Sequence, residues 1–75
     1  MPLDTMLRAI RAETTLEQLR ANDLAVTVKS LLGTGRDGGE AEREMYRVLD
    51  GLALLRAREH AIEVMRTYAF TDAAA

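Results

Sequence analysis

The chain contains no cysteine, and this absence removes several classes of protein at once. Disulfide scaffolds, thiolate zinc sites and cysteine nucleophiles all require the missing thiol. Histidine is nearly absent as well, because His60 stands alone, which excludes His-rich metal sites and leaves little for a Ser–His–Asp arrangement. Aromatic residues are equally scarce, since Tyr46, Tyr68 and Phe70 are the whole supply.

Long apolar runs and an excess of positive charge are also missing. No stretch approaches the ~18 apolar residues that a membrane span needs, and no signal-peptide core precedes a cleavage site. The chain carries 10 Lys+Arg against 12 Asp+Glu, a formal charge of −2, with no basic run. These features predict a soluble, cytoplasmic protein that does not bind nucleic acid.

The length of 75 residues leaves room for one small domain, residues 1–75. A composition of 48% apolar and 29% charged residues is typical of a folded chain. A chain this short buries only ~60% of the surface that its unfolded form exposes. Because disulfides and metal ligands are lacking, oligomerisation or docking to a larger protein is the remaining source of stability.

A glycine-rich stretch, Gly33 to Gly39, holds four of the five glycines and divides the chain into two arms. Both arms are rich in Ala, Leu, Arg and Glu, which favour helices. We therefore predict an all-α fold, an antiparallel helical hairpin with arms over about residues 3–32 and 39–70 and a turn over 33–39. Gly33 is expected to end the first arm as its C-cap, and Asp37 to cap the start of the second.

The first arm does not keep one apolar face, because Leu16, Leu19 and Val26 fall opposite its other apolar residues. Thr14 and Thr15 open overlapping capping boxes, which are typical of a helix start. We therefore favour a short extra N-terminal helix over about residues 3–12 and a longer helix over about residues 15–32. A single unbroken helix is the alternative.

The second arm carries two apolar lines on opposite sides. Counting in sevens gives the first line, a coiled-coil-like seam: Val48, Leu55, Ile62 and Ala69, with Met45, Leu49 and Leu52 beside it. The second line begins further on: Leu54, Ala61 and Tyr68, flanked by Ala57, Val64 and Met65. One neighbouring helix cannot cover both sides, so the second line requires another subunit or another protein. Gly51 interrupts the arm, either as a tolerated imperfection or as a close-approach point for a crossing helix.

Two motifs suggest ligand chemistry but lack its context. The glycine-rich turn matches the G-x-G-x-x-G dinucleotide pattern, yet no second strand follows to complete a βαβ unit. Glu59, His60 and Glu63 have a spacing able to hold a metal, but the first arm offers too few further ligands. We therefore expect no catalytic residue, no cofactor and no metal site.

The hairpin and the second arm resemble the small YscE-type co-chaperones of type III secretion needle assembly. The points of likeness span about residues 31–65: Leu31-Leu32 before the turn Gly35-Arg36-Asp37, then Tyr46, Leu49 and Leu55, then Ala61-Ile62 and Met65. The resemblance implies a cytoplasmic helical hairpin that pairs with a tetratricopeptide-like chaperone and keeps the needle subunit from polymerising prematurely. It implies contacts around Leu52, Leu55, Ile62 and Met65. The irregular first arm and the longer glycine-rich turn depart from the family pattern.

These observations predict a non-enzymatic protein–protein interaction module, an adaptor or co-chaperone, within a heteromeric complex or a homo-oligomer. The candidate partner interface is Leu52, Leu54, Leu55, Ala61, Ile62, Met65 and Tyr68. Two alternatives remain open: a small phage- or mobile-element-encoded inhibitor or regulator of a host protein, and a small DNA-binding regulator.

Overall fold

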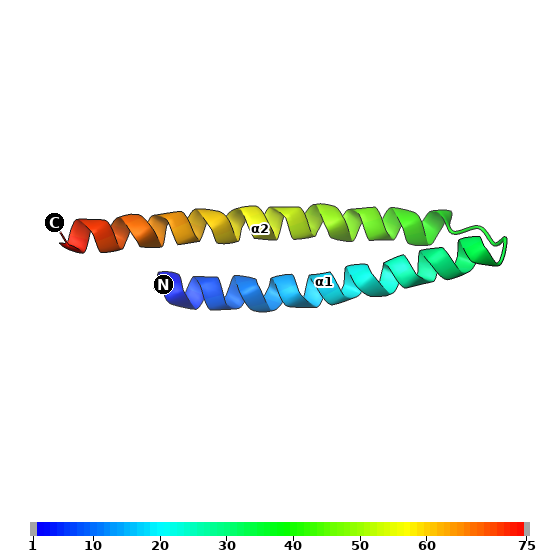
Figure 1. Ribbon diagram of the computed structural model, residues 1–75, viewed down its shortest axis with the longest axis horizontal. Coiled ribbons are helices and arrows are strands. Elements are labelled where there is room, and N and C mark those ends of the chain that lie inside the picture. Colours follow the sequence, from blue (N-terminus) through cyan, green and yellow to red (C-terminus); the bar gives the residue numbers. More distant parts are fainter. Residues whose placement is uncertain (1, 75) are drawn as a thin grey trace.

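A computed structural model describes residues 2–74, with side chains up to residue 69. It contains two helices, α1 (Leu3–Gly33) and α2 (Gly39–Ala74), which lie antiparallel and side by side (Figure 1). The molecule is a rod of 62 × 16 × 14 Å. The predicted all-α hairpin is therefore confirmed. Over the described residues, neither helix is long and apolar enough to cross a membrane.

Helix α1 is continuous, so the prediction of a short extra N-terminal helix is wrong. The two threonines that were expected to cap a new helix lie inside α1 instead. The hydroxyl of Thr14 donates a hydrogen bond to the carbonyl of Ile10 (2.8 Å), and that of Thr15 donates to the carbonyl of Arg11 (3.0 Å). Such bonds to the preceding turn satisfy the hydroxyls without breaking the helix.

The end of α1 is a Schellman motif centred on Gly35. The amide of Arg36 donates to the carbonyl of Leu31 (2.8 Å), and the amide of Gly35 donates to the carbonyl of Leu32 (3.2 Å). Gly35 has φ +72°, the left-handed conformation that this motif requires and that glycine adopts without strain. The predicted C-cap at Gly33 is therefore one residue too early, because Gly33 still belongs to the helix and Thr34 is its C-cap.

Helix α2 begins as predicted, with Asp37 at its start. The Asp37 Oδ1 atom accepts a hydrogen bond from the amide of Gly39 (2.9 Å). The next bond of the helix runs from the amide of Glu42 to the carbonyl of Gly38 (2.8 Å). Glu40 and Glu42 place negative charge in the first turn, where the helix dipole favours it.

The core is a seam between the two helices. The buried residues of α1 are Leu7, Ala21 and Val28; those of α2 are Val48, Leu52, Leu55 and Ile62. Leu7, Ala21 and Val28 are spaced by heptads, as are Val48, Leu55 and Ile62, the pattern of an antiparallel coiled coil. The first apolar line predicted for the second arm is thus confirmed at Val48, Leu55 and Ile62.

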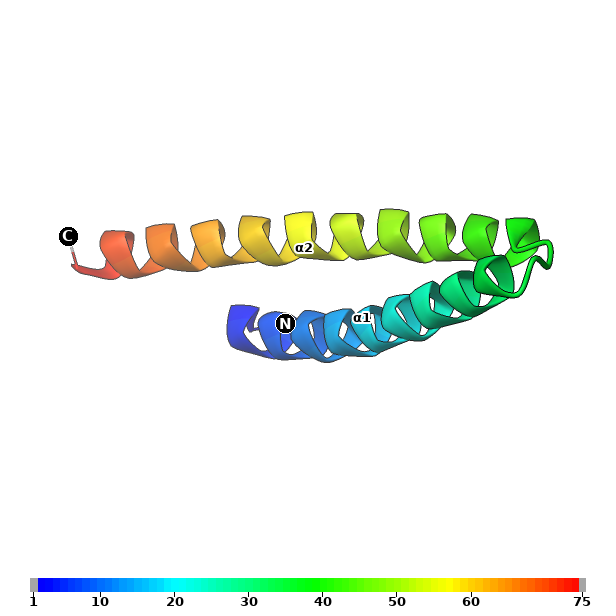
Figure 2. The same cartoon turned by 45° about the vertical axis from the view of Figure 1, so that its right-hand side comes forward.

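Helix α2 extends beyond the start of α1 in both ribbon views (Figure 1, Figure 2). An ion pair between Arg66 and Asp4 (3.0 Å) lies near the N-terminus of α1. Beyond this pair, α2 runs on with no part of α1 beside it. Ala69 is consequently exposed, although its heptad position predicts the seam.

Candidate protein-interaction surface

The seven residues predicted to form a partner interface fall into two groups. Leu52, Leu55 and Ile62 are only 1%, 6% and 4% exposed, because they pack against α1 in the seam. The other four lie on the outer surface of α2: Leu54, Ala61, Met65 and Tyr68. The hairpin therefore uses the first group for its own core and leaves the second group available for contact.

Leu54, Ala61 and Tyr68 of the exposed group belong to a continuous line on α2, and Met65 lies beside it. This α2 outer stripe consists of Leu54, Ala57, Ala61, Val64 and Tyr68, spaced by three and four residues. That spacing places the five side chains on one face of the helix, turned away from α1. Leu54 and Tyr68 are 60% and 67% exposed. At ~1.5 Å per residue, the stripe is about 21 Å long.

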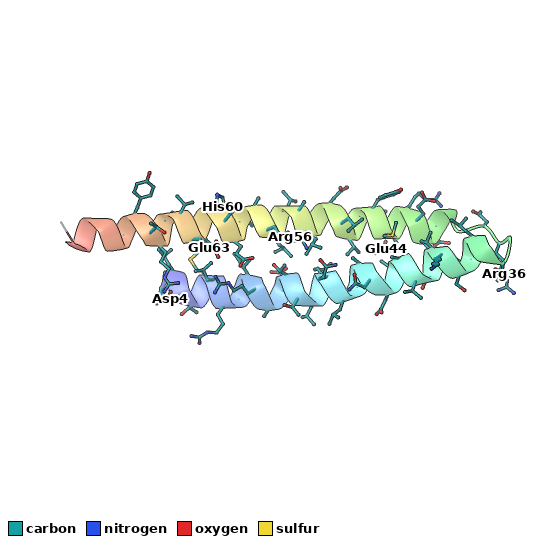
Figure 3. All side chains as sticks on the ribbon, viewed as in Figure 1. Asp4, Arg36, Glu44, Arg56, His60 and Glu63 are labelled. Atoms are coloured by element: carbon teal, nitrogen blue, oxygen red, sulfur yellow. The ribbon has the colours of Figure 1, made fainter. Side chains whose placement is uncertain are left out.

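Charged residues of the same segment turn toward α1, and the clearest case is a fork made by Arg11. Its Nε atom donates to Glu59 (2.9 Å) and its Nη2 atom donates to Glu63 (2.8 Å). These hydrogen bonds, that of Glu59 first and that of Glu63 next, raise the pKa of Arg11 above its ordinary value. Figure 3 shows Glu63 on the side of α2 that faces α1, and His60 on the opposite side.

Two further charged residues of α2 are held by α1 in the same way. Arg56 donates to the side-chain oxygen of Gln18 (2.6 Å), and Arg66 pairs with Asp4 (3.0 Å). Between residues 53 and 69, Arg58 is then the one charged side chain of α2 without such a bond to α1 in the described part of the chain.

The second half of α2 therefore has two apolar sides, because Leu55 and Ile62 lie in the seam while a second apolar line faces outward. Glu59 and Arg66 occupy seam positions, where Leu52 stands one heptad earlier. Large apolar side chains such as Leu54 and Tyr68 face outward instead. An exposed apolar line bordered by few charges is the usual mark of a contact surface.

Helix α1 carries a weaker outer line that was not among the predicted interface residues. Leu16, Leu19 and Val26 are 67%, 56% and 68% exposed, and Asp23 interrupts the line between Leu19 and Val26. Their opposite phase was visible in the sequence, where it indicated a break in the helix. Because α1 is continuous, these residues form an outer face instead.

His60 and an open groove near the turn are the other candidate sites in the described part of the chain. His60 is exposed, and its neighbours Glu59 and Glu63 are both engaged by Arg11. Among the described residues, no three His, Asp or Glu side chains gather closely enough to share a metal ion. An open groove near the turn has a mixed lining, in which Glu44 accepts from both Arg20 (2.6 Å) and Arg47 (3.2 Å).

The glycine-rich turn follows a helix, whereas the dinucleotide pattern that it matches follows a strand. Gly51 also shows no close approach, because a Cβ atom built there meets nothing within 4 Å. Comparison with protein-family models, curated proteins and solved structures finds no match to this chain.

Proposed function

We propose that this hairpin is a non-enzymatic protein-interaction module, an adaptor or co-chaperone, that binds a partner helix along the α2 outer stripe. The observation that supports the proposal is the exposed apolar line on the second half of α2, beside charged residues that bind α1. Leu54 and Tyr68 face outward, while Glu59, Glu63 and Arg66 bind α1. The ion pairs hold the two helices together, but the outward Leu54 and Tyr68 contribute little to the stability of an isolated hairpin.

The shape of the stripe suits a helix as its partner. Apolar residues that repeat every three and four positions lie in a straight row, and an amphipathic helix can lay a matching row against them. Removing this apolar surface from water stabilises the complex by about 25 cal/mol per Å². The same contact raises the stability of a hairpin that has no cysteine to form a disulfide.

A co-chaperone of the YscE type is a more specific form of this proposal. Its partner would be a tetratricopeptide-like chaperone, a protein built from helices. Of the contacts that the resemblance implies, Leu52, Leu55 and Ile62 are buried here and Met65 is exposed. In this form of the proposal, the contact face is centred on Met65 and the neighbouring outer stripe.

The test is affinity purification from the native host, with recovered proteins quantified by mass spectrometry. We expect Leu54→Glu and Met65→Glu to lose the specific partners of the wild-type chain while keeping its helical circular dichroism. Val26→Glu is the matched control, because it places the same charge at an equally exposed apolar site on α1. Equal recovery by wild type and Leu54→Glu, or loss with Val26→Glu alone, would contradict the proposal.

A further inference from the structure

We infer that the partner of the α2 outer stripe is a second copy of this chain, packed antiparallel about a two-fold axis that passes next to Ala61. This inference rests on the proposed function and identifies the occupant of the same surface. Four features of the hairpin support it: the order of side chains along the stripe, the position of Arg58 beside it, the overhang of α2, and the area available.

The stripe matches itself when it is reversed. Its middle residue is Ala61, and Leu54 and Tyr68 stand seven positions to either side. In an antiparallel pair, Leu54 of one copy faces Tyr68 of the other, and Ala57 faces the space between Val64 and Met65. Large side chains therefore meet at both ends, while alanines at the centre let the two helix axes approach closely.

Charge favours the antiparallel arrangement over the parallel one. Arg58 is the charged residue that borders the stripe without a bond to α1 in the described part of the chain. A parallel pair would place the two Arg58 side chains at the same level, and like charges across an interface are unfavourable. An antiparallel pair places Arg58 level with Val64 of the other copy instead.

The overhang of α2 is also covered by this arrangement. The helix continues past the Arg66–Asp4 pair with no part of α1 beside it (Figure 1, Figure 2). An isolated length of helix gains no packing energy. In the antiparallel pair, residues 68–74 of one copy run alongside residues 48–54 of the other, so each overhang lies against the body of a second hairpin. The same register sets Asp50 level with Asp72 of the other copy, and these like charges weaken the pair at its ends.

The available area predicts the strength of the dimer. A single helix pair about 21 Å long buries less than the ~800 Å² per partner that is usual for stable complexes. We therefore expect a reversible dimer whose population rises with protein concentration. A permanent dimer would require more surface than the stripe provides.

Cysteine cross-linking tests the geometry directly, because the native chain contains no cysteine. Ala61→Cys lies next to the axis and should form a disulfide-linked dimer under mild oxidation. Leu54→Cys or Tyr68→Cys alone should not, because each position lies about 10 Å along the helix from the axis. The same position in the two copies is then about 21 Å apart, too far for a disulfide. An equimolar mixture of these two variants should yield the mixed dimer. Val26→Cys measures the background of random collisions.

Sedimentation velocity over a concentration series gives the matching equilibrium measurement. We expect the wild type to pass from monomer to dimer, Leu54→Glu to weaken dimerisation at least tenfold, and Val26→Glu to behave as the wild type. A wild type that stays monomeric, or cross-linking of Leu54→Cys to itself, would overturn the inference. If the chain is monomeric while Leu54→Glu still loses a host protein, the second copy is wrong and the proposed function stands. If the chain is monomeric and Leu54→Glu loses no host protein, both the second copy and the proposed function are wrong.

Discussion

Two leucines of α2, two positions apart, provide a direct test of which face of the helix forms the core. Leu52 is 1% exposed and packs in the seam, whereas Leu54 is 60% exposed on the opposite side. Leu52→Ala and Leu54→Ala remove the same atoms and change helix propensity equally. Any difference in their effect on stability therefore reports burial alone.

The expected difference is large. Replacing a buried leucine by alanine costs about 2–5 kcal/mol, because transfer energy is lost and a cavity remains. Leu54 has less than half of its surface buried, so its replacement costs at most about 1 kcal/mol, and no cavity forms. For a domain of this size, 1 kcal/mol shifts the melting temperature by about 4–8 °C. Leu52→Ala should thus melt well below Leu54→Ala.

The assay is thermal and urea unfolding followed by far-UV circular dichroism, at concentrations low enough for the chain to be monomeric. Equal destabilisation by the two variants, or a larger effect of Leu54→Ala, would refute the seam described here. Either result would mean that α2 is rolled by about half a turn and turns its outer stripe toward α1.

Urea unfolding tests three further expectations. Gly51→Ala should raise stability by about 1 kcal/mol, because its Cβ meets nothing within 4 Å. Gly35→Ala should lower stability by about 1–2 kcal/mol, since φ is +72° there, and an unchanged midpoint would contradict the Schellman motif. Arg11→Gln should lower stability by releasing Glu59 and Glu63, and less so in high salt. The hydrogen bonds to Glu59 and Glu63 raise the pKa of Arg11. The stability that these bonds contribute is therefore fully present below the ordinary pKa of arginine and declines only as the pH rises through the raised pKa. We expect this contribution to stay constant between about pH 6 and 9.

Local signals predicted the helices and the start of α2 well. Asp37 accepts the amide of Gly39 as expected, because an acidic side chain before a run of helix formers has few other roles. The same kind of local signal failed at Thr14 and Thr15. Their hydroxyls can either cap a new helix or bond to the preceding turn of an existing one, and nearby sequence does not distinguish the two outcomes.

The exposure of the candidate interface residues was predicted only in part, for a related reason. Leu54 and Met65 were placed on an exposed face, and they are exposed. Leu52 and Ile62 were assigned both to the seam and to the interface, and the hairpin buries them. Two apolar lines on one helix are equally visible in a sequence, whereas only a neighbouring helix shows which line is covered.

The order of residues was enough to establish two helical arms, a glycine-rich turn between them and more apolar surface than one helix pair can bury. The sequence could not show which side of α2 packs against α1, because this orientation depends on which side chains of α1 lie opposite each position of α2. Glu59 and Arg66 can occupy seam positions only because Arg11 and Asp4 meet them across the interface. This pairing of charges between distant segments leaves Leu54 and its neighbours on the outside.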